Sequence, residues 1–135
     1  MIVPKWVQDL VICVALEEGC ELLPEVVWRR GGSEYSSGQA WTQRTSRSEY
    51  PEGRVVVTAG RSRKDQKLVL LHELAHWLLP YSEQHGSNFW DKAWELYRRY
   101  GVPVLYAKGR EGSYRKGALV AYRRNVDSRK GEVHG

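Results

Sequence analysis

A helix that carries two histidines on its apolar side is predicted by the stretch Ser62-Arg-Lys-Asp-Gln-Lys-Leu-Val-Leu-Leu-His-Glu-Leu-Ala-His-Trp-Leu-Leu-Pro80. Its apolar residues recur at helical spacing, and His72 and His76, four residues apart, fall on one face. Ser62 with Asp65 three residues later resembles a capping box, and Pro80 ends the pattern.

The pattern His72-Glu73-Leu74-Ala75-His76 suits a zinc site. Two imidazoles one helical turn apart can reach one Zn²⁺ at about 2.0–2.1 Å each. Glu73 is rotated away from the ligand positions, so it can take a proton from a zinc-bound water and pass it to a leaving amine. A chance match on an amphipathic helix is the plain alternative, but histidines without partners would be costly to bury there. The residues predict Zn²⁺ at His72 and His76, with Glu73 as the catalytic base.

A catalytic zinc site needs a third protein ligand and an open fourth position. His85 is the first candidate, since it lies nine residues after His76, beyond the break at Pro80. Glu95, nineteen residues after His76, is the alternative third ligand, and Asp91 is a weaker one. Spacing alone leaves this choice open.

The two motifs together resemble those of the SprT-like zinc metallopeptidases. In this chain the HExxH pattern is followed by His85-Gly86-Ser87-Asn88-Phe89-Trp90, and the family has a His-Gly motif with an aromatic residue three positions later. The resemblance implies a zincin-like fold, His72, His76 and His85 as ligands, and Glu73 as the catalytic acid and base. Many members also carry a C-terminal zinc ribbon, for which the two cysteines of this chain are too few.

The surrounding pattern predicts an α+β fold with an N-terminal helix, a short three-stranded sheet, the HExxH helix and further C-terminal helices. We expect one domain over residues 1–126 and a flexible polar tail over 127–135. The expected helices cover residues 4–18, 87–100 and 113–124, and the expected strands cover 25–30, 38–43 and 53–59. The strand from Arg54 to Gly60 is the one we expect to bind an extended substrate.

Charge is unevenly distributed along the 135 residues, whose net charge is +5. Residues 1–25 hold one lysine against five acids, whereas residues 96–135 hold ten lysines and arginines against three acids. Such a basic end can attract DNA or an acidic partner. The flank before the HExxH helix is basic as well, with Arg44, Arg47, Arg61, Arg63 and Lys64.

The apolar stretches are too short to span a membrane, and two cysteines, too few for a disulfide framework, suit a reducing cytoplasm. The leading hypothesis is a cytoplasmic zinc endopeptidase acting on protein or peptide substrates. Two others remain: a nucleic-acid-associated module with a structural or degenerate zinc site, and a regulatory peptidase that cleaves one partner. The sequence does not fix the oligomeric state.

Overall fold

The structure is a computed structural model that describes residues 2–42, 51–112 and 116–127. Helices and a three-stranded sheet confirm the α+β class. The chain divides into two compact units, Met1–Ser82 and Glu83–Gly135. The first holds α1 (Lys5–Glu17), β1 (Glu25–Arg30), β2 (Ser37–Trp41), β3 (Arg54–Ala59) and α2 (Arg63–Leu78), with a 3₁₀ turn, Tyr81–Glu83, at the boundary. The second holds α3 (Ser87–Arg99), α4 (Val104–Gly112), α5 (Lys116–Tyr122) and a π-helical turn, Arg123–Asp127.

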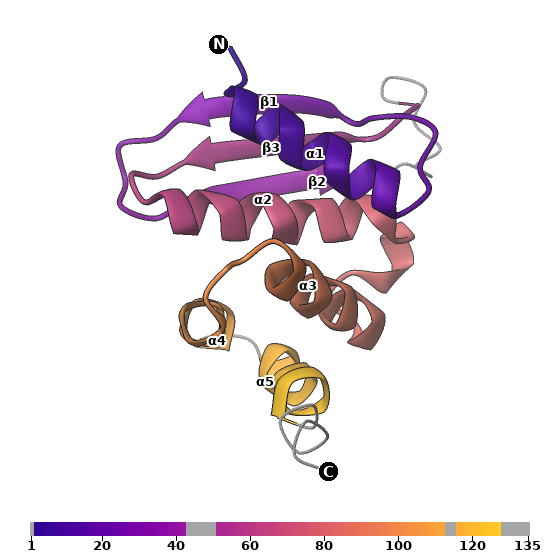
Figure 1. The fold of residues 1–135 in the computed structure, drawn as a ribbon, viewed down its shortest axis with the longest axis vertical. Helices are drawn as coiled ribbons and strands as arrows, with labels where there is room; N and C mark the ends of the chain where they lie inside the picture. The colour runs from indigo at the N-terminus through magenta and orange to yellow at the C-terminus, as the bar shows by residue number, and fades with distance from the viewer. Residues whose placement is uncertain (1, 43–50, 113–115, 128–135) are drawn as a thin grey trace. The chain divides into compact units, whose positions relative to one another are not determined.

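The sheet of the first unit has the order β1-β3-β2, so the last strand in sequence lies in the middle (Figure 1). β1 pairs with β3 in parallel, and β2 pairs with β3 antiparallel. The run Val55-Val56-Val57 explains the central position, because β-branched residues suit a strand that is buried on both sides. Val55 and Val57 are fully buried.

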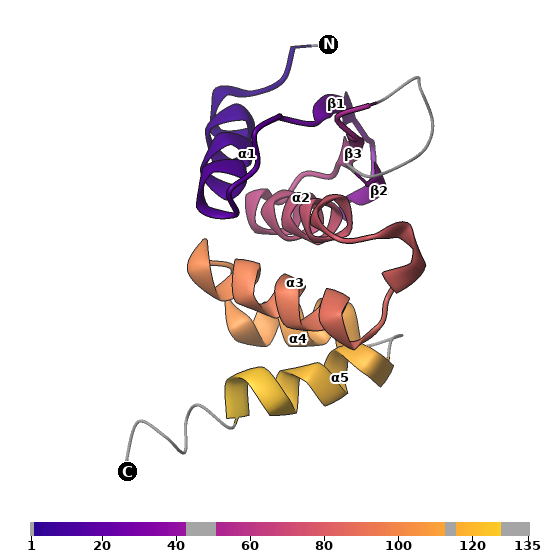
Figure 2. The same ribbon diagram turned by 90° about the vertical axis from the view of Figure 1, so that its right-hand side faces the viewer.

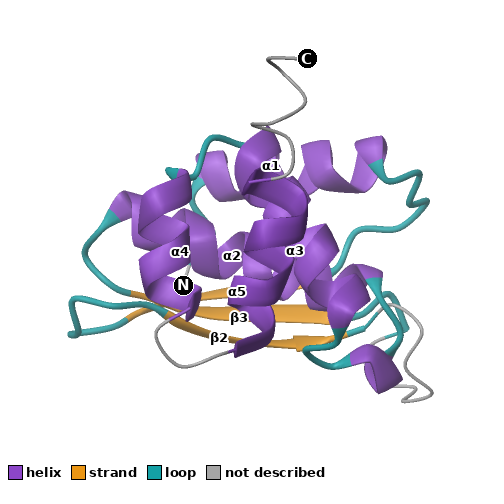
Figure 3. Ribbon diagram, turned by 90° about the horizontal axis from the view of Figure 1, so that it is seen from below, coloured by secondary structure: helices purple, strands orange, loops and turns teal. Residues whose placement is uncertain are grey.

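Helices α1 and α2 lie on the same face of this sheet (Figures 2 and 3). The buried residues of α1 recur at helical spacing and include Val7, Val11 and Val14. In α2 the buried residues extend around most of the helix, from Leu68 to Trp77. The HExxH pattern therefore lies on a largely buried helix rather than on a solvent-facing one.

The start of α2 is fixed by a buried polar network. The Ser62 side chain accepts a hydrogen bond from the Asp65 amide, as the capping pattern predicts. The Asp65 carboxylate in turn accepts the amide of Ser36, and the Ser36 hydroxyl accepts the amide of Gly60 at 2.8 Å. The helix that carries the histidines is thereby attached to the segment that precedes β2.

The end of α2 is fixed by Trp77, which is fully buried. Its indole nitrogen donates a hydrogen bond to the Glu52 carbonyl at 2.8 Å. The next residue, Gly53, has a φ of +84°, and a Cβ there would lie 2.5 Å from the Trp77 ring. Both the backbone conformation and the close approach therefore require glycine.

We expect Gly53→Ala to lower the free energy of unfolding by roughly 2–4 kcal/mol, from backbone strain and overpacking together. Urea denaturation measures the loss. Gly19→Ala is the matched control, because Gly19 also has a positive φ of +71° but no atom within 4 Å of the added Cβ. Equal losses in the two variants would show that contact with Trp77 contributes nothing.

The second unit is built around the aromatic face of α3. Phe89, Trp90, Trp94 and Tyr97 are all buried there. The Trp94 indole donates to the Ala118 carbonyl at 3.0 Å, which ties α3 to α5.

The helix expected over residues 113–124 is confirmed by α5, although residues 113–115 lie outside the described part of the chain. A second helix in this region, α4, was not predicted. α4 begins directly after Pro103, whose carbonyl accepts the Ala107 amide at 3.0 Å. Gly109 and Gly112 lower its intrinsic helix propensity, which explains why the sequence did not reveal it.

The tail expected for residues 127–135 lies, from 128 onward, outside the described residues. Across residues 2–42, 51–112 and 116–127, none of the helices combines the length and the apolar character that a membrane crossing requires.

Candidate metal centre

His72 and His76 lie side by side on α2, as their spacing predicts. Their ring centroids are 5.1 Å apart, and a ligand nitrogen of one lies within 4.8 Å of a ligand nitrogen of the other. His72 is 9% exposed and His76 is half-buried. Two nitrogens bound to one tetrahedral Zn²⁺ would lie about 3.3 Å apart, a separation that side-chain rotation can provide. The pair therefore fits zinc, although imidazole also binds other transition metals.

Glu73 is buried next to these histidines and is 6% exposed. It lies against Gly38 of β2, where an added Cβ would fall 2.7 Å from both Cγ and Oε2 of Glu73. A glycine at this strand position thus makes room for the carboxylate. Gly38 was not among the residues predicted from the sequence to contribute to the site, although a glycine inside a strand often marks such a close approach.

The sheet order contradicts the prediction that β3 binds the substrate. β3, which contains most of the predicted stretch Arg54–Gly60, is paired with β1 on one side and β2 on the other. Its backbone is therefore already hydrogen-bonded and cannot bind a further strand. Within the described sheet β2 is an edge strand, and it is the strand that lies against Glu73.

Gly38→Ala tests this contact. We expect a 10- to 100-fold loss of any Glu73-dependent turnover with metal content unchanged, because a small displacement of a catalytic group is costly. The control is Gly32→Ala, since an added Cβ at Gly32 meets no atom within 4 Å. Steady-state kinetics of both variants would measure the difference, and equal activities would show that Gly38 is not required.

His85 belongs to the second unit and lies just before α3, whose N-cap is Gly86. Its ring is half-buried and contacts two aromatic rings of α3, with centroid separations of 5.0 Å to Phe89 and 5.7 Å to Trp90. Glu83 stabilises the first turn, because its carboxylate accepts the Asn88 amide at 2.9 Å. The aromatic residue three positions after His-Gly thus packs directly on the histidine.

The two carboxylates considered as alternative third ligands both have cationic partners within the second unit. Glu95 forms ion pairs with Lys92 and Arg99 on its own helix. Asp91 pairs with Arg124 and accepts a hydrogen bond from Asn125 at 2.7 Å. These ion pairs involve both carboxylate oxygens of Glu95, whereas the contacts of Asp91 all fall on its Oδ1.

No family model matches the chain, and neither a curated protein nor a solved structure is significantly similar to it. The interpretation of the site therefore rests on its residues and their geometry.

Proposed function

We propose that this protein is a zinc-dependent peptidase of SprT-like type, with His72, His76 and His85 as the metal ligands and Glu73 as the catalytic base. One observation carries the proposal. The two histidines share one face of a largely buried helix, and the carboxylate between them occupies space left by a glycine of the neighbouring edge strand. A histidine pair of purely structural use would have no need for that carboxylate.

The chemistry follows from these positions. Zinc, when bound, supplies a Lewis acid that polarises the scissile carbonyl and makes water acidic enough to deprotonate near neutral pH. Glu73 accepts the proton of the attacking water at its carboxylate and then delivers it to the leaving nitrogen. Since Glu73 is 6% exposed, little bulk water competes for this transfer.

The exposed edge of β2 is the proposed binding surface for the substrate. An extended peptide can add to such an edge through main-chain hydrogen bonds, and Gly38 of the same strand lies against Glu73. Recognition through the main chain selects weakly by sequence, which suits an endopeptidase.

His85 is the proposed third ligand for two reasons. Its ring is oriented by Phe89 and Trp90, and the competing carboxylates Glu95 and Asp91 are engaged with cations. Imidazole also completes a three-histidine zinc site with an open fourth position.

Metal content tests this assignment. Protein purified without added zinc should carry about one zinc per chain, and His85→Ala should lose most of it because one of three ligands is gone. Glu95→Ala is the matched control and should keep its zinc.

The opposite pattern, with zinc lost only in Glu95→Ala, would contradict His85 as the ligand. Absence of bound metal from the unsubstituted protein, together with no cleavage of casein on adding zinc, would refute the proposed function itself.

A further inference from the structure

A second candidate site lies in the first unit, at the carboxyl ends of the parallel strands β1 and β3 and the start of α2. It is a hollow of about 490 Å³, within the size range of small-molecule pockets. None of the three histidines lines it. Its lining includes Trp6, Trp28, Arg30, Arg61, Arg63 and Gln66.

This pocket is strongly basic. Its described lining contains three arginines and no acid. Arg30 and Arg61 make no ion pair with any residue in the described part of the chain, and both side chains are exposed. The nearby acid in the first turn of α2 is Asp65, which is buried and accepts the Ser36 amide. The positive end of the α2 dipole adds to the same field.

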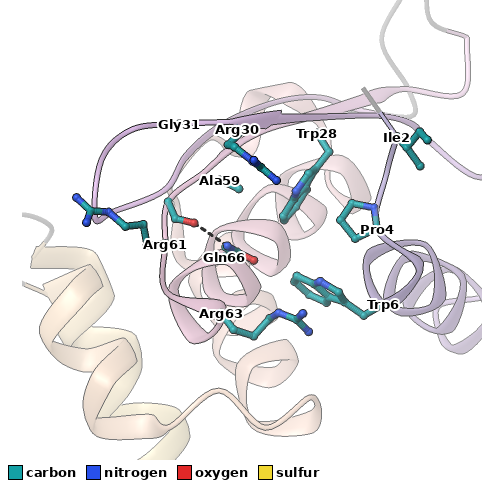
Figure 4. Close-up of a pocket in the computed structure, with 11 residues that line it drawn as sticks. Ile2, Pro4, Trp6, Trp28, Arg30, Gly31, Ala59, Arg61, Arg63 and Gln66 are labelled. Carbon is teal, nitrogen blue, oxygen red and sulfur yellow. Dashed lines mark hydrogen bonds between the residues drawn. The ribbon is translucent and has the colours of Figure 1, made fainter.

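Two indole rings form the wall of the pocket. Trp6 and Trp28 meet edge to face with their ring centroids 5.7 Å apart. The guanidinium of Arg63 lies over the Trp6 ring at 4.3 Å from its centroid. Figure 4 shows Arg30 and Arg63 on opposite sides of the two indoles, whereas Arg61 extends away from them at the rim.

Gln66 is a further polar residue of the pocket lining. Its side-chain amide donates to the Gly60 carbonyl at 2.6 Å, the interaction drawn as a dashed line in Figure 4. This bond joins α2 to the segment that follows β3. The bond therefore fixes the position of the Gln66 side chain within the pocket lining.

We propose that this pocket binds a nucleotide, either free or within a single strand of nucleic acid. Arg30 and Arg63 would bind the phosphate through charge-assisted hydrogen bonds, and the base would pack against Trp6 and the guanidinium that lies on it. An acidic peptide could use the arginines alone, whereas a nucleotide uses the arginines through its phosphate and the indoles through its base. The site goes beyond the proposed peptidase function and does not depend on it.

The experiment uses the full chain as purified. Fluorescence anisotropy with an end-labelled oligothymidylate and calorimetry with thymidine monophosphate distinguish a nucleic-acid strand from a free nucleotide. Arg30→Gln should weaken binding about tenfold, because one charge-assisted contact is lost. Arg29→Gln is the matched control, since this neighbouring arginine is exposed but does not line the pocket.

Trp6→Leu should also weaken binding about tenfold through lost stacking. Arg63→Gln gives a second measurement of the phosphate contact if Trp6→Leu does not fold. The salt dependence of binding should become less steep in each arginine variant of the pocket. Glu73→Gln should bind as the unsubstituted protein does, which separates this proposal from the peptidase.

Three results would overturn the proposal. The first is no binding of either probe at low salt. The second is an equal loss in Arg29→Gln and Arg30→Gln, which would reduce the effect to a general positive field. The third is competition by polyglutamate as strong as that by the oligonucleotide, which would point to an acidic peptide instead.

Discussion

Glu73→Gln is expected to remove peptidase activity and leave zinc bound. Glutamine keeps the shape of the side chain, so it fits against Gly38 as the glutamate does, but it cannot accept the proton of the attacking water. General acid–base catalysis contributes about 10²–10⁴-fold to such reactions, and we expect a loss of kcat in that range. Cleavage of casein measures the activity, and metal analysis of the same sample measures the zinc.

Glu95→Gln is the matched control for this substitution. It removes the same charge from a glutamate that pairs with Lys92 and Arg99 on α3, so turnover should stay within about twofold of the unsubstituted protein. Unchanged proteolysis in Glu73→Gln would show that the assigned mechanism is wrong. Loss of zinc in that variant would instead make Glu73 a ligand.

The helices and strands near the site were predictable because their signals are local. The apolar spacing, the Ser62 cap and the terminating Pro80 define α2 without reference to any other segment. The valine run of β3 identifies a buried strand in the same way. In each case the information lies within one turn or one strand of the residue concerned.

The order of the strands was not predictable from these signals. β3 is the last strand in sequence and the nearest to α2 along the chain, which made it the natural candidate for the substrate edge. Its central position depends on pairing with β1, about thirty residues earlier, and with β2, which lies between β1 and β3 in the sequence. Such non-local pairing leaves no periodic trace, and the same holds for the contact between Gly38 and Glu73.

The alternative third ligands, Glu95 and Asp91, also differ in whether their ion-pair partners could be predicted from the sequence. The partners of Glu95 lie three residues before it and four residues after it on one helix, so its ion pairs could be inferred from the sequence. Asp91 is paired with an arginine 33 residues away, and no sequence rule links the two. Spacing from His76 alone could not separate either carboxylate from His85.

Only the positive charge of the basic pocket, and not its aromatic rings, could be predicted from the sequence. Arg61 and Arg63 belong to the basic flank that precedes α2, which solubility alone could explain. The indoles that give this flank a possible specificity come from α1 and β1, more than thirty residues earlier. The charge of this flank follows from neighbouring residues in the sequence. That the arginines lie next to the indole rings follows only from the folded structure.

His76→Ala is expected to abolish zinc binding and the stabilisation that zinc provides. A ligand that binds only the folded state stabilises it in proportion to the logarithm of its concentration over Kd, about 4 kcal/mol at a thousandfold excess. For a chain of this size, a loss of 4 kcal/mol corresponds to a decrease in Tm of roughly 10–20 °C. The apo form of the unsubstituted protein should then unfold near the temperature of the variant, because both lack the same metal.

Thermal unfolding with and without a chelator tests this linkage. The chelator should lower the Tm of the unsubstituted protein and of Glu95→Ala, whose carboxylate is outside the proposed ligand set, and leave His76→Ala unchanged. Because His76 is half-buried, part of the destabilisation could come from lost packing rather than lost metal. The chelator response separates the two: packing alone predicts that His76→Ala still responds to the chelator as the unsubstituted protein does, and that result would exclude His76 as a ligand.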